Sequence, residues 1–201
     1  RGLFALGVSL DSHIPETHDA LRGTKGAFRN ALRALRFAAK CRLYPYVIAV
    51  ATREFLERSN FEAYLRFVAN ETPAREIHLL EPCAAGKLSG NTGALLDARD
   101  IRRILEYQKM VSQEETLPIL STFAYLESSE AFGCGAGLTH LYIDGSGEVC
   151  PCNLVPLSFG NVRNESLPMI LNRMGAYFEK PRPSCIGNLL GPYIAGGRLP
   201  L

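Results

Sequence analysis

The sequence predicts an α/β fold of parallel strands that alternate with helices, followed by a small α+β region that contains a β-hairpin. Three observations support this prediction. Strand-like apolar runs are separated by segments with helical periodicity, the pattern changes after Ala131 to short strands around a turn, and three of the six cysteines fall within residues 134–152. The 201 residues are 47% hydrophobic and 21% charged, which is typical of a globular protein.

The first strand–helix units lie at the start of the chain. Residues Leu3 to Leu10 form a near-continuous apolar run, as expected for a strand that is buried on both faces. A loop that contains Pro15 follows, and residues 28–38 then carry apolar side chains at helical spacing. The run YPYVIAVA (residues 44–51) predicts the second strand.

Further units follow the second strand. Ser59 and Glu62 form the pattern of a capping box at the start of a helix. The run REIHLLEP (residues 75–82) predicts the third strand, Asp97 is expected to cap the next helix, and residues 116–126 predict an extended segment. Strands separated by helices indicate parallel pairing through right-handed crossover connections, three in a row.

The pattern after Ala131 indicates a different kind of structure. The run THLYIDGSGEVCPC predicts two short strands around the turn at residues 144–147, which is a hairpin signal. A helix is expected to start near Ser166 and to reach Phe178, and the tail from Pro181 is expected to be a loop. We therefore expect residues 1–126 to form the α/β domain and residues 127–201 to form the cysteine-bearing domain.

Composition excludes several classes of partner. The net charge is only +2, so we expect no nucleic-acid partner. One helix carries basic residues at helical spacing and is interpreted as a solvated face: Arg29, Arg33, Arg36 and Lys40. No apolar run is long enough to cross a bilayer and no signal peptide opens the chain, so we expect no membrane partner and a cytoplasmic location. Cysteines in that setting are expected to be reduced thiols or ligands rather than disulfides.

The spacing of the cysteines indicates metal chemistry. Cys150 and Cys152 are two residues apart, so on a strand their side chains point the same way at a separation of roughly 6–7 Å. A disulfide needs Cβ atoms about 3.8 Å apart, which this arrangement does not allow. Together with Cys134 and Cys185 they provide four soft thiolates, which favour zinc or an iron–sulfur cluster. A cubane cluster spreads its thiolates wider than zinc does, so the spacing favours the cluster weakly.

The remaining cysteines and a nearby histidine have simpler interpretations. Cys83 follows the third predicted strand, where barrel enzymes place working groups, but a single thiol in a loop is more often incidental. Cys41 lies at a helix end and is interpreted as a packing residue. His140 lies near Cys134 and could replace one thiolate on a cluster.

Cys134 and the later run GEVCPCN resemble the SPASM/Twitch auxiliary-cluster domain of radical S-adenosylmethionine (SAM) enzymes. That pattern has a cysteine, a variable gap, and then a glycine, four residues and a second cysteine. Gly147 with Cys152 fits this pattern and Gly145 with Cys150 fits it equally, so the register stays open. The resemblance implies a single-cluster, Twitch-like domain with one [4Fe–4S] cluster on Cys134, Cys150, Cys152 and Cys185.

The first part of the chain resembles the same enzymes. The run GVSLDSHIPETHDALRGTKGAFRNALRAL looks like the fourth strand, loop and helix of the radical SAM barrel. This implies that the chain is the second half of a partial (β/α)6 barrel followed by the auxiliary domain. It also implies that Ser9 contacts the SAM ribose and that Arg22 reaches the methionyl carboxylate, with Asp11 as a further candidate. A ribose suits a short hydroxyl or carboxylate partner, and a carboxylate suits the guanidinium fork.

The CxxxCxxC pattern that defines the family is absent from these 201 residues. We expect it upstream of Arg1, expect this segment alone to be inactive, and assign no catalytic residue. The resemblance implies a parent enzyme that reduces SAM to methionine and a 5′-deoxyadenosyl radical, with an external electron donor and a peptide or protein as substrate. The alternative from another class is a non-catalytic scaffold module that binds zinc on the same four cysteines.

Overall fold

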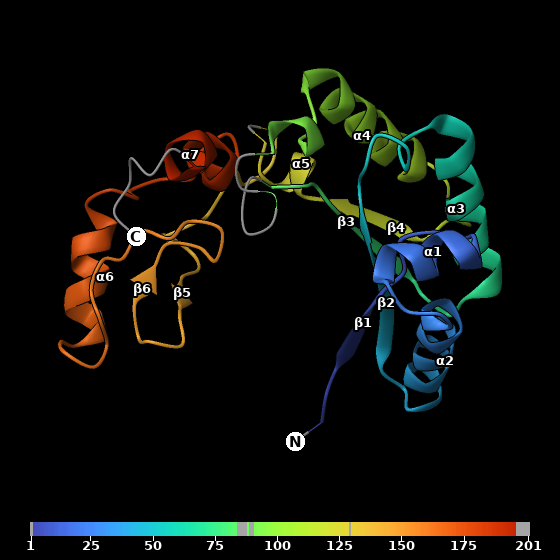
Figure 1. Cartoon of the computed structure of the whole chain (residues 1–201), viewed down its shortest axis with the longest axis horizontal. Coiled ribbons are helices and arrows are strands. Elements are labelled where there is room, and N and C mark those ends of the chain that lie inside the picture. The colour runs from blue at the N-terminus through green and yellow to red at the C-terminus, as the bar shows by residue number, and fades with distance from the viewer. Residues whose placement is uncertain (1, 84–87, 89–90, 129, 196–201) are drawn as a thin grey trace. The chain divides into compact units, whose positions relative to one another are not determined.

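The computed structural model describes residues 2–83, 88, 91–128 and 130–195, and they form two compact units (Figure 1). The sheet unit consists of residues 1–82 and 96–123, and the cysteine unit consists of residues 83–95 and 124–201. The second boundary lies three residues before the expected division at 126/127. The structure also assigns residues 83–95 to the cysteine unit, which the sequence pattern did not indicate.

Four parallel strands form the sheet, in the order β1-β2-β3-β4. Their bounds are β1 (Ala5–Ser9), β2 (Tyr44–Val50), β3 (Glu76–Leu80) and β4 (Ile119–Thr122). Parallel neighbours need crossover connections, and helices supply them. These helices are α1 (Pro15–Arg22), α2 (Ala27–Lys40), α3 (Arg58–Glu71) and α4 (Ala98–Val111), and α5 (Phe123–Leu126) follows β4. The predicted α/β class is confirmed, and the expected extended segment contains β4.

Local signals explain where the helices start and where the predictions differ. Helix α1 lies in the expected loop, because Pro15 occupies its first turn and Gly23 ends it in the left-handed conformation at φ 63°. The predicted capping box at Ser59 is wrong: α3 starts at Arg58, which pairs with Glu62 at 2.9 Å. The predicted cap of α4 is confirmed, since the Asp97 carboxylate accepts the backbone N–H groups of residues 99 and 100.

One face of the sheet carries the core of the sheet unit. Side chains alternate along β2 between fully or nearly buried and half-buried, so the two faces differ. The largest buried side chains come from α3, and Phe61 stacks on Tyr107 of α4 with ring centroids 4.1 Å apart. The buried Tyr64 hydroxyl donates to the Leu10 carbonyl at 2.7 Å, which anchors the chain just beyond β1.

The cysteine unit has little regular structure. Its elements are a 3-10 turn η2 (Thr92–Ala94), strands β5 (Tyr142–Ile143) and β6 (Val149–Cys150), and helices α6 (Leu167–Gly175) and α7 (Ile186–Ala195). The predicted hairpin is confirmed, because β5 and β6 pair antiparallel. Helix α6 ends before Phe178, and the loop expected from Pro181 is wrong because it contains α7. In the part of the chain that the structure describes, no helix has the length and apolarity to span a membrane.

Candidate auxiliary-cluster site and SAM-facing residues

Cys134 lies beside the chain segment that leads to Cys185. Its backbone N–H donates to the Arg182 carbonyl at 2.7 Å, and the Arg182 N–H donates back to the Cys134 carbonyl at 3.1 Å. Gly133 allows this close crossing: its φ is 88°, and a Cβ there would lie 2.6 Å from the Arg182 oxygen. This two-bond bridge brings residues from distant parts of the sequence to one place.

The loop after Cys134 is tied to the Cys-Pro-Cys segment. The Gly137 N–H donates to the Pro151 carbonyl at 2.9 Å. Gly137 has a φ of 70°, and a Cβ at this position would lie 2.6 Å from the Phe178 ring, so only glycine allows the contact. The Cys134 loop is therefore held between the hairpin and the chain that follows α6.

Cys152 lies beyond the end of the hairpin. Strand β6 ends at Cys150, and the chain bends at Pro151. The Leu154 N–H then donates a hydrogen bond to Cys152 Sγ, with 3.5 Å between nitrogen and sulfur. Burial raises the pKa of the Cys152 thiol, and the hydrogen bond from the Leu154 N–H partly offsets this increase. The negative charges of three nearby groups raise the pKa further: Cys185, Cys134 and Glu127. Cys152 thus has both Cys134 and Cys185 as electrostatic neighbours.

Cys185 immediately precedes α7. The Asn188 N–H donates a hydrogen bond to the Cys185 sulfur, as it would to a capping side chain at the start of a helix. A Cβ on Gly187 would lie 3.6 Å from Cys185 Sγ. The same Cβ would lie 3.0 Å from Leu154 Cβ, so the turn after Cys152 packs on the turn after Cys185. A hydrogen bond with the Cys83 thiol raises the pKa of Cys185, and burial raises it further.

Cys150 has a different environment from Cys134, Cys152 and Cys185. It pairs with Tyr142 in the hairpin and is buried. Burial raises the pKa of its thiol, and the negative charges of Asp144 and Glu148 raise it further. The expectation that the Cys150 and Cys152 side chains point the same way required an extended strand through both residues. The strand ends at Cys150 and the chain bends at Pro151, so that condition is not met.

The structure distinguishes the two glycines that fit the cysteine pattern. Gly147 has a φ of 95°, and a Cβ there would lie 2.7 Å from Asn161 Oδ1. Asn161 is itself held in place, because its amide donates to the Ser146 carbonyl at 3.1 Å and to Glu148 Oε1 at 2.8 Å. Gly145 has open space around its Cα. The glycine requirement therefore falls on Gly147, which lies five residues before Cys152.

Cys134, Cys150, Cys152 and Cys185 are soft thiolate donors of the kind that zinc or an iron–sulfur cluster selects. All six cysteines lie among the described residues and none forms a disulfide. Within the described part of the chain, no three histidine, cysteine, aspartate or glutamate side chains are grouped closely enough to hold one metal ion. Zinc draws its sulfurs to within roughly 4 Å of each other, whereas a cubane binds one thiolate per iron and needs a wider shell. Cys134 and Cys152 also pack into an apolar cluster with Met174, Phe178 and Ile186.

The three residues expected to contact SAM lie at the end of β1, in the loop that follows it and at the end of α1. Ser9 is the last residue of β1, and Arg22 is the last residue of α1. Arg22 Nη2 lies 2.5 Å from Asp11 Oδ2, and the Asp11 side chain is only 9% exposed. The Asp11 N–H donates to Nδ1 of the buried His18 at 3.1 Å. Asp11 thus holds Arg22, and the four other N–H donors of the guanidinium can serve a second carboxylate.

Sequence patterns did not indicate a polar network on the half-buried face of the sheet. Glu76 Oε1 accepts the Ser121 hydroxyl at 2.6 Å and lies 2.8 Å from His78 Nε2, and Glu76 Oε2 accepts the Tyr44 hydroxyl at 3.1 Å. These residues come from three neighbouring strands. The sequence signal for this network was the alternation in β3, where the polar Glu76 and His78 are separated by the apolar Ile77.

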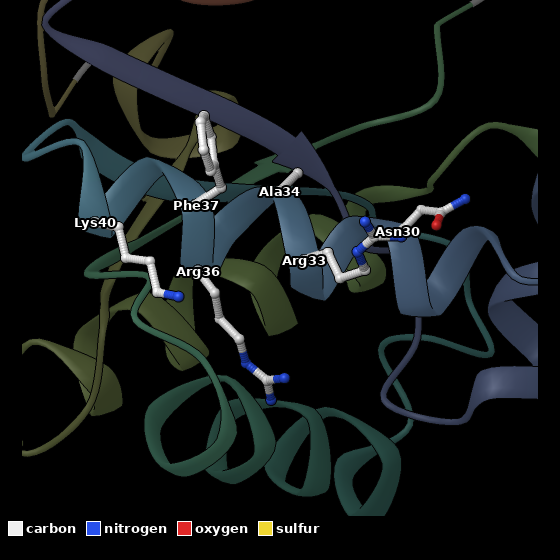
Figure 2. Close-up of a pocket in the computed structure, with 6 residues that line it drawn as sticks. All are labelled: Asn30, Arg33, Ala34, Arg36, Phe37 and Lys40. Atoms are coloured by element: carbon white, nitrogen blue, oxygen red, sulfur yellow. The ribbon is translucent and has the colours of Figure 1, made fainter.

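The basic helix shows no such organisation. Figure 2 shows the side chains of a surface hollow on α2, which is lined by Asn30, Arg33, Ala34, Arg36, Phe37 and Lys40. The three basic side chains of this hollow and that of Arg29 are exposed, as expected for a solvated helix face. None of the residues expected to contact SAM lines this hollow.

Comparison with protein families identifies the cysteine-bearing part. Residues 134–186 match the SPASM family, described as an iron–sulfur cluster-binding domain. AlbA of Bacillus subtilis (strain 168), an antilisterial bacteriocin subtilosin biosynthesis protein, is 28% identical over 83% of this chain and 37% of its own length. The AdoMet-dependent heme synthase of Oleidesulfovibrio alaskensis is 25% identical over 90% of this chain and 51% of its own length. Residues 134–186 thus match a SPASM domain, and the chain as a whole is similar to parts of these longer proteins.

Solved structures show the same fold. Native anSMEcpe with bound AdoMet superposes with a TM-score of 0.59 at 16% identity, over 88% of this chain and 52% of that one. The same protein with AdoMet and the Kp18Cys peptide gives a TM-score of 0.58 at 17% identity, over 88% of this chain and 53% of that one. The chain spans about half the length of these relatives or less. The predicted partial barrel with an iron–sulfur domain is confirmed, and the predicted cofactors, an iron–sulfur cluster and SAM, agree with these matches.

Proposed function

We propose that this chain is the SAM-facing and auxiliary-cluster part of a radical SAM enzyme that modifies a peptide or protein in the cytoplasm, with electrons from an external donor. The observation that carries the proposal is the arrangement of Cys134, Cys152 and Cys185 within the SPASM region. Two observations support a common site for these distant residues: Cys134 bonds through its backbone to Arg182 near Cys185, and the turn after Cys152 packs on the turn after Cys185.

The peptide substrate is supported by the relatives. AlbA is named for the biosynthesis of the bacteriocin subtilosin, and anSMEcpe has been solved with a bound peptide. An auxiliary cluster, when bound, provides a one-electron site whose potential depends on hydrogen bonds to its sulfurs. The N–H groups of Leu154 and Asn188 make such bonds to Cys152 and Cys185. In this proposal the residues of the SPASM region hold the cluster, shield it from water and stabilise the charge of its thiolates.

Metal analysis tests the proposal against the zinc module. The full-length protein, purified without oxygen and reconstituted with iron and sulfide, is expected to bind more iron than the CxxxCxxC cluster alone accounts for and to absorb broadly near 400 nm. A variant that lacks the CxxxCxxC cysteines serves as the matched control, and it is expected to keep a cluster on the SPASM region. Stoichiometric zinc and no iron in that variant would contradict the proposal.

The SAM-facing role of Arg22 gives a separate expected result. In the full-length enzyme, Arg22→Ala removes a charge-assisted hydrogen bond and is expected to weaken SAM binding by about 1.5–3 kcal/mol, which is about tenfold or more. Equilibrium binding of SAM under anaerobic conditions measures the effect. Arg33→Ala, on the exposed face of α2, is the matched control and should leave SAM affinity unchanged.

Arg22→Ala also leaves the largely buried Asp11 carboxylate without its ion-pair partner, so the melting temperature must be recorded with the affinity. Arg22→Lys keeps a positive charge beside Asp11 but lacks the guanidinium fork. If a folded Arg22→Lys or Arg22→Ala variant binds SAM as tightly as the unmodified enzyme, Arg22 is not part of the SAM site.

A further inference from the structure

Two buried side-chain nitrogen atoms have no hydrogen-bond partner among the described residues: His13 Nδ1 and Arg182 Nε. The Arg182 guanidinium has other contacts, because its Nη2 donates to the Tyr177 carbonyl at 3.0 Å and the group lies over the Phe178 ring. A buried polar atom without a partner costs free energy and is rare in folded proteins. The unpaired nitrogen of His13 therefore needs an explanation.

The residues on both sides of His13 are held in place. The buried Ser12 hydroxyl accepts the Ile14 N–H at 3.0 Å, which closes a tight turn around His13. The Ile14 carbonyl accepts the His18 N–H at 3.0 Å, and Nδ1 of the buried His18 accepts the Asp11 N–H at 3.1 Å. The unpaired Nδ1 thus belongs to a turn whose neighbouring polar groups are all bonded.

This turn lies just beyond the carboxyl end of β1. The four strands are parallel, so their carboxyl ends lie at one edge of the sheet, and α/β proteins bind their ligands outside this edge. Two of the residues expected to contact SAM, Ser9 and Asp11, precede His13 in the same segment, and Asp11 pairs with Arg22, the third. His13 therefore stands in the loop that carries the expected SAM contacts.

The chemistry of the imidazole suits a polar ligand without a fixed charge requirement. Burial lowers the pKa of His13, which favours the neutral ring. A neutral imidazole has one N–H donor and one acceptor nitrogen, so Nδ1 can pair with either kind of group according to its tautomer. Both kinds of group occur in SAM, which has hydroxyl and ammonium donors and carboxylate and adenine acceptors.

We infer that His13 is a further residue of the SAM site and that its Nδ1 forms a hydrogen bond with bound SAM. The inference rests on the proposed function, because it adds a residue to the same SAM-facing end of β1. Its support is separate from that of the other contacts. Ser9, Asp11 and Arg22 follow from a sequence resemblance, whereas His13 follows from the unpaired buried nitrogen and the turn that holds it.

Equilibrium binding of SAM to the full-length enzyme, under anaerobic conditions, tests this inference. His13→Leu removes the hydrogen bond and is expected to weaken SAM binding about two- to tenfold. His13→Asn can place an amide atom near the position of Nδ1 and is expected to bind SAM nearly as well as the unmodified enzyme. His13→Gln places its amide further out and is expected to behave like His13→Leu. Arg33→Ala, on the exposed face of α2, is again the control.

The melting temperature of the SAM-free enzyme separates a binding role from a packing role. Since Nδ1 has no partner there, His13→Leu removes an unpaired polar atom and is expected to leave the melting temperature unchanged or to raise it. Unchanged SAM affinity in folded His13→Leu would overturn the inference. A loss of SAM affinity in His13→Asn but not in His13→Gln would overturn the assignment to Nδ1.

Arg22→Ala distinguishes this inference from the proposed function. If Arg22→Ala weakens SAM binding and folded His13→Leu does not, only the inference about His13 fails. If neither substitution weakens SAM binding, SAM does not lie at this end of β1, and the roles of both residues fail together. A full-length protein that binds no SAM at all would contradict the proposed function and the inference with it.

Discussion

Removing the auxiliary cluster is expected to unfold the cysteine unit while the sheet unit stays folded. The cysteine unit has two strands of two residues each, and its apolar cluster is small and involves two of the proposed ligand thiols, Cys134 within it and Cys152 packed against it. A region with so little apolar surface to bury needs additional stabilisation, and metal binding then contributes directly to the free energy of folding. The sheet unit has its own core, around Phe61 and Tyr64.

Hydrogen exchange of the full-length protein measures this effect. In the cluster-free state the amides of Cys134, Gly137 and Val149, which are hydrogen-bonded within the cysteine unit, are expected to lose protection by about a hundredfold or more. The amides of Leu10 and Ala51, which bond to carbonyls of neighbouring strands or strand ends in the sheet unit, are expected to change little.

The matched control for this experiment is Cys41→Ala. Cys41 is exposed at the end of α2 and is not part of the cysteine unit, so its loss should change neither iron content nor exchange. Equal protection of the cysteine-unit amides in the loaded and the cluster-free protein would show that this unit folds without metal. Loss of protection in both units together would show that the chain unfolds as one cooperative body.

The order of strands and helices in the sheet unit could be predicted from the sequence, because each strand is an apolar run and each major helix has its own periodicity. Helix α1 was missed because it has only eight residues and its one fully buried side chain is His18, a polar residue. Helix α7 was missed because Gly187, Gly191 and Pro192 interrupt a helical pattern in a segment that resembles a loop. In both cases tertiary packing outweighs weak local preference.

The residues of the candidate cluster site could be predicted only in part. Cys134, Cys152 and Cys185 stand in a recognisable pattern, but the choice between Cys150 and Cys152 depends on a bend at Pro151 that alternation along a strand does not include. The grouping of residues 83–95 with the cysteine unit was not predicted either. No periodicity or spacing within the sequence encodes such a grouping.

The glycine that precedes Cys152 provides the sharpest test of the register. Gly147→Ala is expected to destabilise the loaded cysteine unit by about 2–4 kcal/mol, because alanine is strained at a φ of 95° and its Cβ would lie 2.7 Å from Asn161 Oδ1. Asn161 cannot move aside easily, since its side chain bonds to Ser146, Glu148 and the Arg163 N–H. Breaking these bonds would release the turn that positions the strand before Cys152.

Gly145→Ala is the matched control, two residues away in the same turn. A Cβ at Gly145 meets nothing within 4 Å, and its φ lies outside the left-handed range, so the change in stability should stay within about 0.5 kcal/mol. Denaturant unfolding followed by the cluster absorbance, together with iron content, compares the two variants. Because Gly145 precedes Cys150 by the same five residues, equal destabilisation by the two substitutions would restore the register that ends at Cys150. Destabilisation by Gly147→Ala alone would assign the pattern to Cys152, with the turn acting as a rigid support for its thiolate.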